Sequence, residues 1–221
     1  LYDPGTMPMM NQPAYFPRGL NIPYAERFKE ELKIPVAIVG AFDLPMAEQI
    51  VAENKADVVA MARTLIADPD CVNKARKGQE TAIRPCIRCN ACINRSHYQF
   101  LSVRCAVNPV IGREAELNYL PPPARRKKVV VIGGGPAGLE AARTAAGRRH
   151  RVVLYEKSDR LGGALIMASS APFKADMRAY LDWTVRTTLE SPDIKVNLET
   201  EAAPDLVRAD EPDVIILAAG S

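Results

Sequence analysis

The sequence has few aromatic residues, few histidines and no long apolar run. Aromatic residues make up 6% of the 221 positions, and there are one tryptophan and two histidines. The longest apolar stretches, near residues 129–132 and 214–219, fall far short of the ~20 residues that span a membrane. Internal repeats, low-complexity tracts and a signal peptide are also lacking. We therefore expect a cytoplasmic protein without a membrane span.

Charge is nearly balanced. The 29 Lys+Arg against 26 Asp+Glu leave a net charge of +3, which is too small to predict a nucleic-acid or membrane partner. The basic run at residues 125–128 is accordingly interpreted as a solvated entry to a strand. A composition of 48% apolar and 25% charged residues is typical of a soluble globular protein. The first residue is Leu rather than Met, so we expect an excerpt from a longer chain.

Helix and strand patterns alternate in two stretches. Before residue 82 we expect helices over 24–32 and 46–53, strands over 34–39 and 57–62, and a helix starting near Asp68 and Pro69. From residue 128 we expect strands over 129–132, 151–155, 194–198 and 214–217, and helices over 136–146 and 174–189. The last of these helices presents Met177, Leu181, Val185 and Leu189 at helical spacing. Repeated βα units imply an α/β fold with parallel strands.

A glycine fingerprint opens the second stretch. Gly133, Gly135 and Gly138 lie between a strand and a helix, in the order typical of a dinucleotide-binding turn. The first permits a tight turn, the second lets a pyrophosphate approach the backbone, and the third lets the helix pack closely. Glu156 ends the next strand, where its carboxylate can accept hydrogen bonds from ribose hydroxyls. The expected cofactor contacts also include Ala137 in the first helical turn and the second glycine turn at Gly163 and Ala164. Together these features resemble the FAD-binding domain of two-dinucleotide flavoprotein reductases.

Four of the five cysteines lie within twenty residues of one another. Cys86, Cys89 and Cys92 are spaced three apart, and Cys105 follows. A compact triplet with one distant partner favours a [4Fe–4S] cluster, in which each thiolate takes one iron corner. A zinc site and unligated thiols remain the alternatives. Cys71 is interpreted as a small buried hydrophobe, and His97 is not needed as a ligand.

Together these motifs resemble the iron–sulfur branch of the Old Yellow Enzyme family, which includes 2,4-dienoyl-CoA reductase, 2-enoate reductase and trimethylamine dehydrogenase. The resemblance is carried by residues 34–40, 60–69, the cysteine motif and residues 133–138. It implies an FMN-binding (β/α)8 barrel followed by nucleotide-binding domains. The expected parts here are the barrel end with strands seven and eight (1–83), an iron–sulfur segment (84–112), a linker (113–127) and a truncated Rossmann-like FAD domain (128–221).

By this resemblance the FMN phosphate would be held by Gly40 and Ala41 after strand seven, and by Ala62 and Arg63 after strand eight. Loops at these places in such barrels commonly hold phosphate. Several members carry an arginine beside the position of Ala41, so any FMN contact from that loop would be through the backbone. Arg63 has the alternative of a surface charge at a helix start. Since the family's proton donor comes from earlier strands, no catalytic residue is assigned in this sequence.

The resemblance implies an NAD(P)H-dependent oxidoreductase that reduces the C=C bond of an α,β-unsaturated carbonyl compound. Its cofactors would be FMN, a [4Fe–4S] cluster and FAD. One alternative is an amine dehydrogenase of the trimethylamine dehydrogenase type, with ADP in the second nucleotide site. Another is an electron-transfer module without its own substrate site. We expect a small-molecule substrate, no nucleic acid and no membrane, leave homo-oligomerisation open, and expect this segment alone to be inactive.

Overall fold

The structure is a computed structural model that describes residues 6–220, without the side chain of Met7. The chain divides into two compact units, residues 1–118 and 119–221. The finer domain boundaries expected from the sequence remain a prediction. No helix in the described part of the chain is both long and apolar enough to cross a bilayer.

The first unit is built around two short parallel strands. Its elements are α1 (Met7–Met10), α2 (Ile22–Glu31), β1 (Ala37–Val39), α3 (Leu44–Ala52), β2 (Val58–Ala60), α4 (Ala62–Ala67), α5 (Cys71–Arg76), α6 (Ala91–Ile93) and α7 (Glu114–Leu117), with a 3-10 turn at Glu80–Ala82 and a π-helical turn at Asn94–Tyr98. β1 pairs with β2 in the register Ala37↔Val58. Asp43 caps α3, because its carboxylate accepts the Met46 N–H at 3.0 Å.

The strand expected over residues 34–39 is shorter in the structure. Only residues 37–39 pair with β2, and the Ile34 side chain is 66% exposed. A small core forms behind the two strands, with Ile38, Phe42 and Ile50 each at most 4% exposed. This core fixes the loops that leave the carboxyl ends of β1 and β2.

The helix start expected at Asp68 is wrong. A helix that the sequence did not reveal, α4, ends there, and α5 begins only at Cys71. Asp68 is 5% exposed, and its carboxylate accepts the Lys74 ammonium at 2.6 Å and the Arg84 N–H at 2.8 Å. Asp68 therefore anchors the start of the cysteine segment instead of capping a helix. Cys71 is fully buried, as expected of a small hydrophobe.

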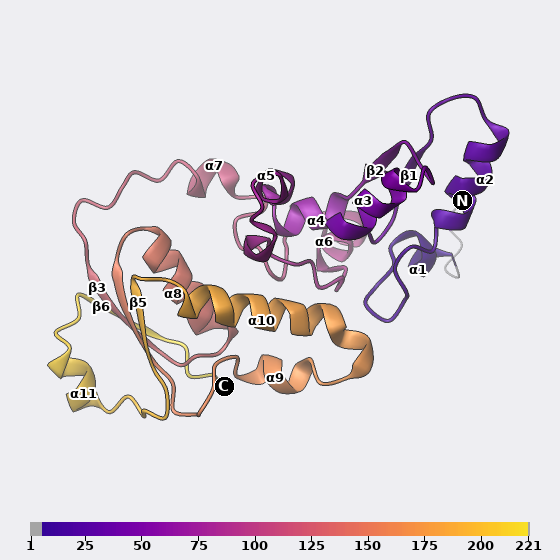
Figure 1. Cartoon of the computed structure of the whole chain (residues 1–221). Coiled ribbons are helices and arrows are strands. Elements are labelled where there is room, and N and C mark those ends of the chain that lie inside the picture. The colour runs from indigo at the N-terminus through magenta and orange to yellow at the C-terminus, as the bar shows by residue number, and fades with distance from the viewer. Residues whose placement is uncertain (1–5, 221) are drawn as a thin grey trace. The chain divides into compact units, whose positions relative to one another are not determined.

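The second unit is a four-stranded parallel sheet with helices packed on both of its faces (Figure 1). Its elements are β3 (Lys128–Ile132), α8 (Pro136–Gly147), β4 (Arg151–Tyr155), α9 (Ala164–Ala168), a 3-10 turn (Pro172–Lys174), α10 (Ala175–Leu189), β5 (Ile194–Asn197), α11 (Pro204–Ala209) and β6 (Val214–Leu217). The sheet order is β5-β4-β3-β6, and every pair is parallel. This order places β3 and its glycine turn at the centre of the sheet, where dinucleotides bind in such folds.

Alternate residues of β3 face two different cores. Val129 and Val131 pack with Leu139 and Ala142 of α8, whereas Val130 packs with Val207 of α11 on the other face. A strand buried on both faces needs a continuous apolar run, and the sequence provides one at residues 129–132. The apolar strand pattern therefore reflects a covered parallel sheet.

The buried face of α10 agrees with the expected one at Val185, which packs against the core, but not at Leu189. Leu189 is 55% exposed, whereas Tyr180, Trp183, Thr184 and Thr188 are buried. The Thr188 hydroxyl donates to the Thr184 carbonyl at 2.7 Å, which lets a polar side chain lie in the interior. The Trp183 ring stacks on Tyr180 at 5.9 Å, and the Arg143 guanidinium lies 4.4 Å from its centre.

The basic run before β3 is paired rather than only solvated. Arg125 bonds to Asp213 at 2.6 Å, Lys128 bonds to Asp210 at 2.8 Å, and Arg126 pairs with Asp193. The three aspartates lie in or near loops that precede β5 and β6. These pairs are largely exposed, so each contributes little to stability.

Candidate cofactor sites

A cavity lies beside the loops that follow β1 and β2. Its volume is about 220 Å³, and Gly40, Ala62 and Arg63 line it together with Cys92, Ser96 and His97. The first three are expected phosphate-loop residues, and Cys92 belongs to the cysteine motif. The first unit therefore brings these two sequence-predicted sites to one cavity.

Arg63 lies in the first turn of α4 and is part-buried. Its Nη1 donates to the Gln12 carbonyl at 2.9 Å and to Asn90 Oδ1 at 2.5 Å. Burial lowers the pKa of the guanidinium, and the thiols of Cys86 and Cys92 partly oppose that shift. Arg63 is thus a positive charge held inside the unit, close to the cysteines.

Ala41 is not presented to the cavity in the same way. Its N–H donates to Gln12 Oε1 at 3.2 Å, and its carbonyl accepts the Arg18 Nη1 at 2.7 Å. Gln12 is fully buried, and its amide also donates to the Met9 carbonyl at 3.0 Å. The backbone contact expected of Ala41 toward a phosphate therefore requires the Gln12 side chain to move.

The four cysteines of the motif are free thiols in one neighbourhood. Burial raises the pKa of the Cys86 thiol to about 11, although the Arg88 N–H and the Arg63 charge favour its thiolate. Burial also raises the pKa of Cys92, and the charges of Cys105 and Cys89 act on both of these groups. Thiolates are the ligand form, so a bound metal would have to supply the positive charge that keeps them deprotonated.

The donor set of the motif, four cysteine thiols, fits an iron–sulfur cube. Thiolates on one zinc ion lie within ~4 Å of each other, because each Zn–S bond is ~2.3 Å. Residues 6–220 contain no group of three or more Cys, His, Asp or Glu side chains arranged around a point for one ion. An iron–sulfur cube instead accepts each thiolate at a separate iron corner, so its four ligands need not meet at one ion.

The glycine turn of the second unit is tightly packed at two of its three positions. A Cβ on Gly133 would lie 2.3 Å from the Ala218 carbonyl oxygen, and Gly133 has φ +107°. A Cβ on Gly138 would lie 1.9 Å from the Gly133 carbonyl oxygen. Gly135 instead faces open space, with no heavy atom within 4 Å of such a Cβ. Since Gly135 precedes the N-terminus of α8, this open backbone fits an approaching pyrophosphate.

Glu156 is held beside this turn by three donors. Oε2 accepts the Gly134 N–H at 2.6 Å, and Oε1 accepts the Ser158 N–H at 2.9 Å and its hydroxyl at 2.7 Å. Burial works to raise the pKa of Glu156, but these hydrogen bonds and Lys157 outweigh it and hold the pKa below the usual range. The group is therefore a fixed carboxylate, as a ribose acceptor requires.

The second glycine turn packs directly onto the first. The Gly162 N–H donates to the Gly134 carbonyl at 2.8 Å, and a Cβ on Gly163 would lie 2.9 Å from Gly135 Cα. Gly163 has φ +50°, and Ala164 then starts α9. Ala137 occupies the first turn of α8. The residues expected to contact FAD thus gather at the carboxyl edge of the sheet.

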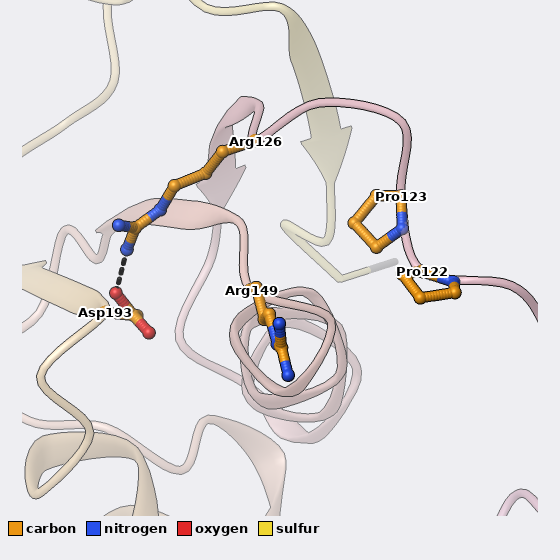
Figure 2. Close-up of a pocket in the computed structure, with 5 residues that line it drawn as sticks. All are labelled: Pro122, Pro123, Arg126, Arg149 and Asp193. Carbon is orange, nitrogen blue, oxygen red and sulfur yellow. Dashed lines mark hydrogen bonds and ion pairs between the residues drawn. The ribbon is translucent and has the colours of Figure 1, made fainter.

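A concavity of this unit lies at the opposite edge of the sheet, where the strands begin. Figure 2 shows its lining, with Arg126 paired to Asp193 and with Arg149, Pro122 and Pro123 around them. These residues precede β3, β4 and β5, whereas nucleotides bind at the carboxyl ends of parallel strands. This concavity is therefore not the dinucleotide site.

Three residues at these sites were not identified from the sequence. The contact of Gln12 with Ala41 and that of Asn90 with Arg63 each join residues at least 27 positions apart, for which no local pattern exists. Ser158 follows Glu156 by two residues, and that spacing of a hydroxyl from a carboxylate could have indicated its role.

Two stretches of the chain match the models of two flavoenzyme families. Residues 14–82 match the NADH:flavin oxidoreductase / NADH oxidase family, and residues 128–195 match the FAD dependent oxidoreductase family. The chain is similar to an NADH oxidase of Thermoanaerobacter brockii, with 44% identity over 98% of this chain and 33% of the relative. It is also similar to a cinnamate reductase of Clostridium sporogenes, with 36% identity over 95% of this chain and 31% of the relative.

A solved structure shares this fold over nearly the whole chain. Histamine dehydrogenase from Rhizobium sp. 4-9 superposes with a TM-score of 0.90 at 26% identity, over 98% of this chain and 32% of that one. The chain spans about a third of the length of the curated relatives it matches.

Proposed function

The chain belongs to the iron–sulfur flavoprotein branch of the Old Yellow Enzyme family, and on that premise we propose that it is a segment of an NAD(P)H-dependent reductase of activated C=C bonds. The proposed substrate class is an α,β-unsaturated acid or enoyl thioester. The similarity to a cinnamate reductase, named for an unsaturated acid, supports this class, and the similarity to an NADH oxidase supports a nicotinamide donor.

One observation carries the proposal: the cavity lined by Gly40, Ala62 and Arg63 is also lined by Cys92. A flavin phosphate in that cavity would lie beside the iron–sulfur motif within a single unit. The second unit adds a separate dinucleotide turn with an open backbone at Gly135 and a fixed carboxylate at Glu156. Such an order of sites suits an enzyme that takes electrons at one cofactor and delivers them at another.

The residues of this chain act by binding and orienting cofactors. Arg63 would neutralise the FMN phosphate, and Gly40 and Ala62 would leave room for it, with Ala41 contributing only after Gln12 moves. Cys86, Cys89, Cys92 and Cys105 would hold the cluster. Gly133, Gly135, Ala137 and Gly138 would receive the FAD pyrophosphate, Glu156 its ribose, and Gly163 and Ala164 would close the turn over it. If bound by these residues, FAD would supply a hydride acceptor for NAD(P)H, the cluster would supply single-electron transfer, and FMN would supply a hydride donor for the substrate.

A second candidate is an amine dehydrogenase, which would run electrons outward through the cluster. The TM-score of 0.90 to histamine dehydrogenase favours it. The open turn at Gly135 leaves room for a pyrophosphate, which FAD and ADP share, so support for the reductase comes from the similarity to a cinnamate reductase.

Flavin analysis of the full-length protein separates the two candidates. We expect extraction and chromatography to yield FMN and FAD in equal amounts. In anaerobic titration, NADH or NADPH should bleach both flavins, and a 2-enoate or enoyl thioester should reoxidise them. FMN with ADP, together with bleaching by an alkylamine but not by NAD(P)H, would contradict the reductase and support the amine dehydrogenase.

A further inference from the structure

One backbone segment of the first unit receives side chains from both candidate sites. We call residues 11–16 the strap. The Asn11 carbonyl accepts a hydrogen bond from Asn90 Nδ2 at 2.5 Å. The Gln12 carbonyl accepts one from Arg63 Nη1 at 2.9 Å. Through its side chain, Gln12 also accepts the N–H of Ala41, in the loop after β1. The strap therefore contacts both phosphate loops and the cysteine motif.

Arg88 ties the motif to the same strap. Its guanidinium donates to the Phe16 carbonyl at 2.8 Å and to the Ala14 carbonyl at 3.2 Å, while its N–H donates to Cys86 Sγ at 3.4 Å. The side chain is 7% exposed although it carries a charge. A buried guanidinium is costly unless negative charge lies nearby, and the thiolates of the motif would supply it.

Asn90 lies between Cys89 and Cys92 and makes two contacts with one amide. Its Oδ1 accepts Arg63 Nη1, and its Nδ2 donates to the Asn11 carbonyl. Its backbone has φ +57°, a conformation that asparagine adopts more readily than most residues. Asn90 thus links the cysteine motif by a hydrogen bond to Arg63, in the first turn of α4.

Arg63 faces two negative groups that the proposed function places here. It lines the cavity beside Gly40, and its charge also acts on the thiols of Cys86 and Cys92. Its bonded partners among residues 6–220 are a carbonyl and an amide oxygen, neither of which neutralises a guanidinium. One positive charge is therefore shared between a phosphate position and a thiolate cluster.

We propose that Asn90 is a positioning residue that fixes Arg63 between the flavin phosphate and the iron–sulfur motif, so that the two cofactors are retained and tuned together. The inference rests on the proposed function. It assigns the coupling between FMN binding and the cluster potential to the Asn90 side-chain amide. A fixed positive charge near the thiolates stabilises the reduced, more negative cluster and raises its reduction potential. Release of Arg63 should weaken FMN retention and lower that potential at the same time.

The test uses the full-length holoprotein with Asn90→Gly, because glycine accepts φ +57° at no steric cost while it removes the amide. We expect FMN to bind about tenfold more weakly, the lower end for a lost hydrogen bond to a charged group. The equilibrium constant for cluster reduction, followed by redox titration with electron paramagnetic resonance, should fall about threefold to tenfold, or ~30 to 60 mV for one electron. FAD content should not change.

Two further variants complete the test. Asn54→Gly is the matched control, since Asn54 also has a left-handed backbone, at φ +55°, but is exposed in a turn. It should leave both readouts unchanged. Asn90→Asp keeps an acceptor for Arg63, so it should retain FMN near the wild-type level, while its added negative charge should lower the cluster potential.

The possible outcomes distinguish a failure of this inference from a failure of the proposed function. Wild-type protein without FMN or without iron and sulfide would overturn the proposed function and this inference with it. Wild-type protein with both groups, and Asn90→Gly with unchanged FMN affinity and potential, would overturn only the role of Asn90. Loss of the cluster from Asn90→Gly with FMN affinity intact would also overturn it, because the two effects must occur together.

Discussion

Three of the five glycines in α8 and its preceding turn, Gly135, Gly138 and Gly147, should respond differently to the same added methyl group. A Cβ on Gly138 would lie 1.9 Å from the Gly133 carbonyl oxygen, whereas a carbon–oxygen contact needs about 3.3 Å. Helix α8 or the turn would have to move by roughly 1.4 Å against backbone on both sides. Gly147, the last residue of α8, has nothing within 4 Å of such a Cβ.

We expect Gly138→Ala to destabilise the second unit by about 2 kcal/mol or more. Overpacking costs ~3 kcal/mol at the upper end, and the helix preference of alanine returns up to ~1 kcal/mol. For a unit of this size, that corresponds to a fall of roughly 8 °C or more in the unfolding temperature. Gly147→Ala should leave this temperature unchanged or slightly raise it.

Gly135→Ala should affect binding and not folding. Its backbone, with φ −76°, suits alanine, and the added methyl would protrude where the pyrophosphate must approach. We expect FAD affinity to fall by about 10- to 150-fold, the scale of a lost charged hydrogen bond. Scanning calorimetry of FAD-free protein and calorimetric FAD titration measure the two effects separately. Wild-type stability in Gly138→Ala, or a destabilised Gly135→Ala with normal FAD affinity, would refute this reasoning.

Three further predictions concern single side chains. Cys89→Ala should abolish iron and acid-labile sulfide in the full-length protein, whereas stoichiometric zinc without sulfide in the wild type would contradict the cluster. Arg63→Ala should weaken FMN retention by roughly 1.5–3 kcal/mol, the scale of a charged hydrogen bond, without changing FAD content; FMN that survives dialysis equally well would show that Arg63 does not bind it. The lowered pKa of Glu156 means that its carboxylate stabilises the fold fully above its ordinary pKa of 4.5, and that this contribution disappears as the pH falls through the folded value. The unfolding temperatures of wild type and Glu156→Gln should therefore differ most near pH 7 and converge in acid, and a difference independent of pH would argue against this role.

The second unit was largely predictable because its signals are local. The strands at residues 151–155 and 214–217 have the expected bounds, and α8 begins at Pro136 as its sequence indicates. Each of these elements combines an apolar run with a nearby turn or helix start. The glycine fingerprint depends on the same short-range pattern, so the carboxyl edge of the sheet could be placed from the sequence.

The first unit was less predictable because its key contacts are distant in the chain. Helix α4 begins after Met61 without a capping side chain, so nothing in its sequence announced it. Asp68 resembled a helix cap, but its carboxylate bonds to Arg84, which is 16 residues away. The strap meets Arg63 and Asn90 across 51 and 79 residues, and only the folded chain reveals such pairs.

Trp183 has a spectroscopic consequence. It is the only tryptophan among the 221 residues, and it lies 8% exposed on α10 of the second unit. Its indole is stacked on Tyr180 and covered by the Arg143 guanidinium, so its emission should be blue-shifted while this packing persists. The tryptophan emission of this chain, excited selectively from that of its seven tyrosines, therefore reports on the second unit alone. A flavin bound in that unit would quench it by energy transfer, so that loading of the dinucleotide site could be followed without a label.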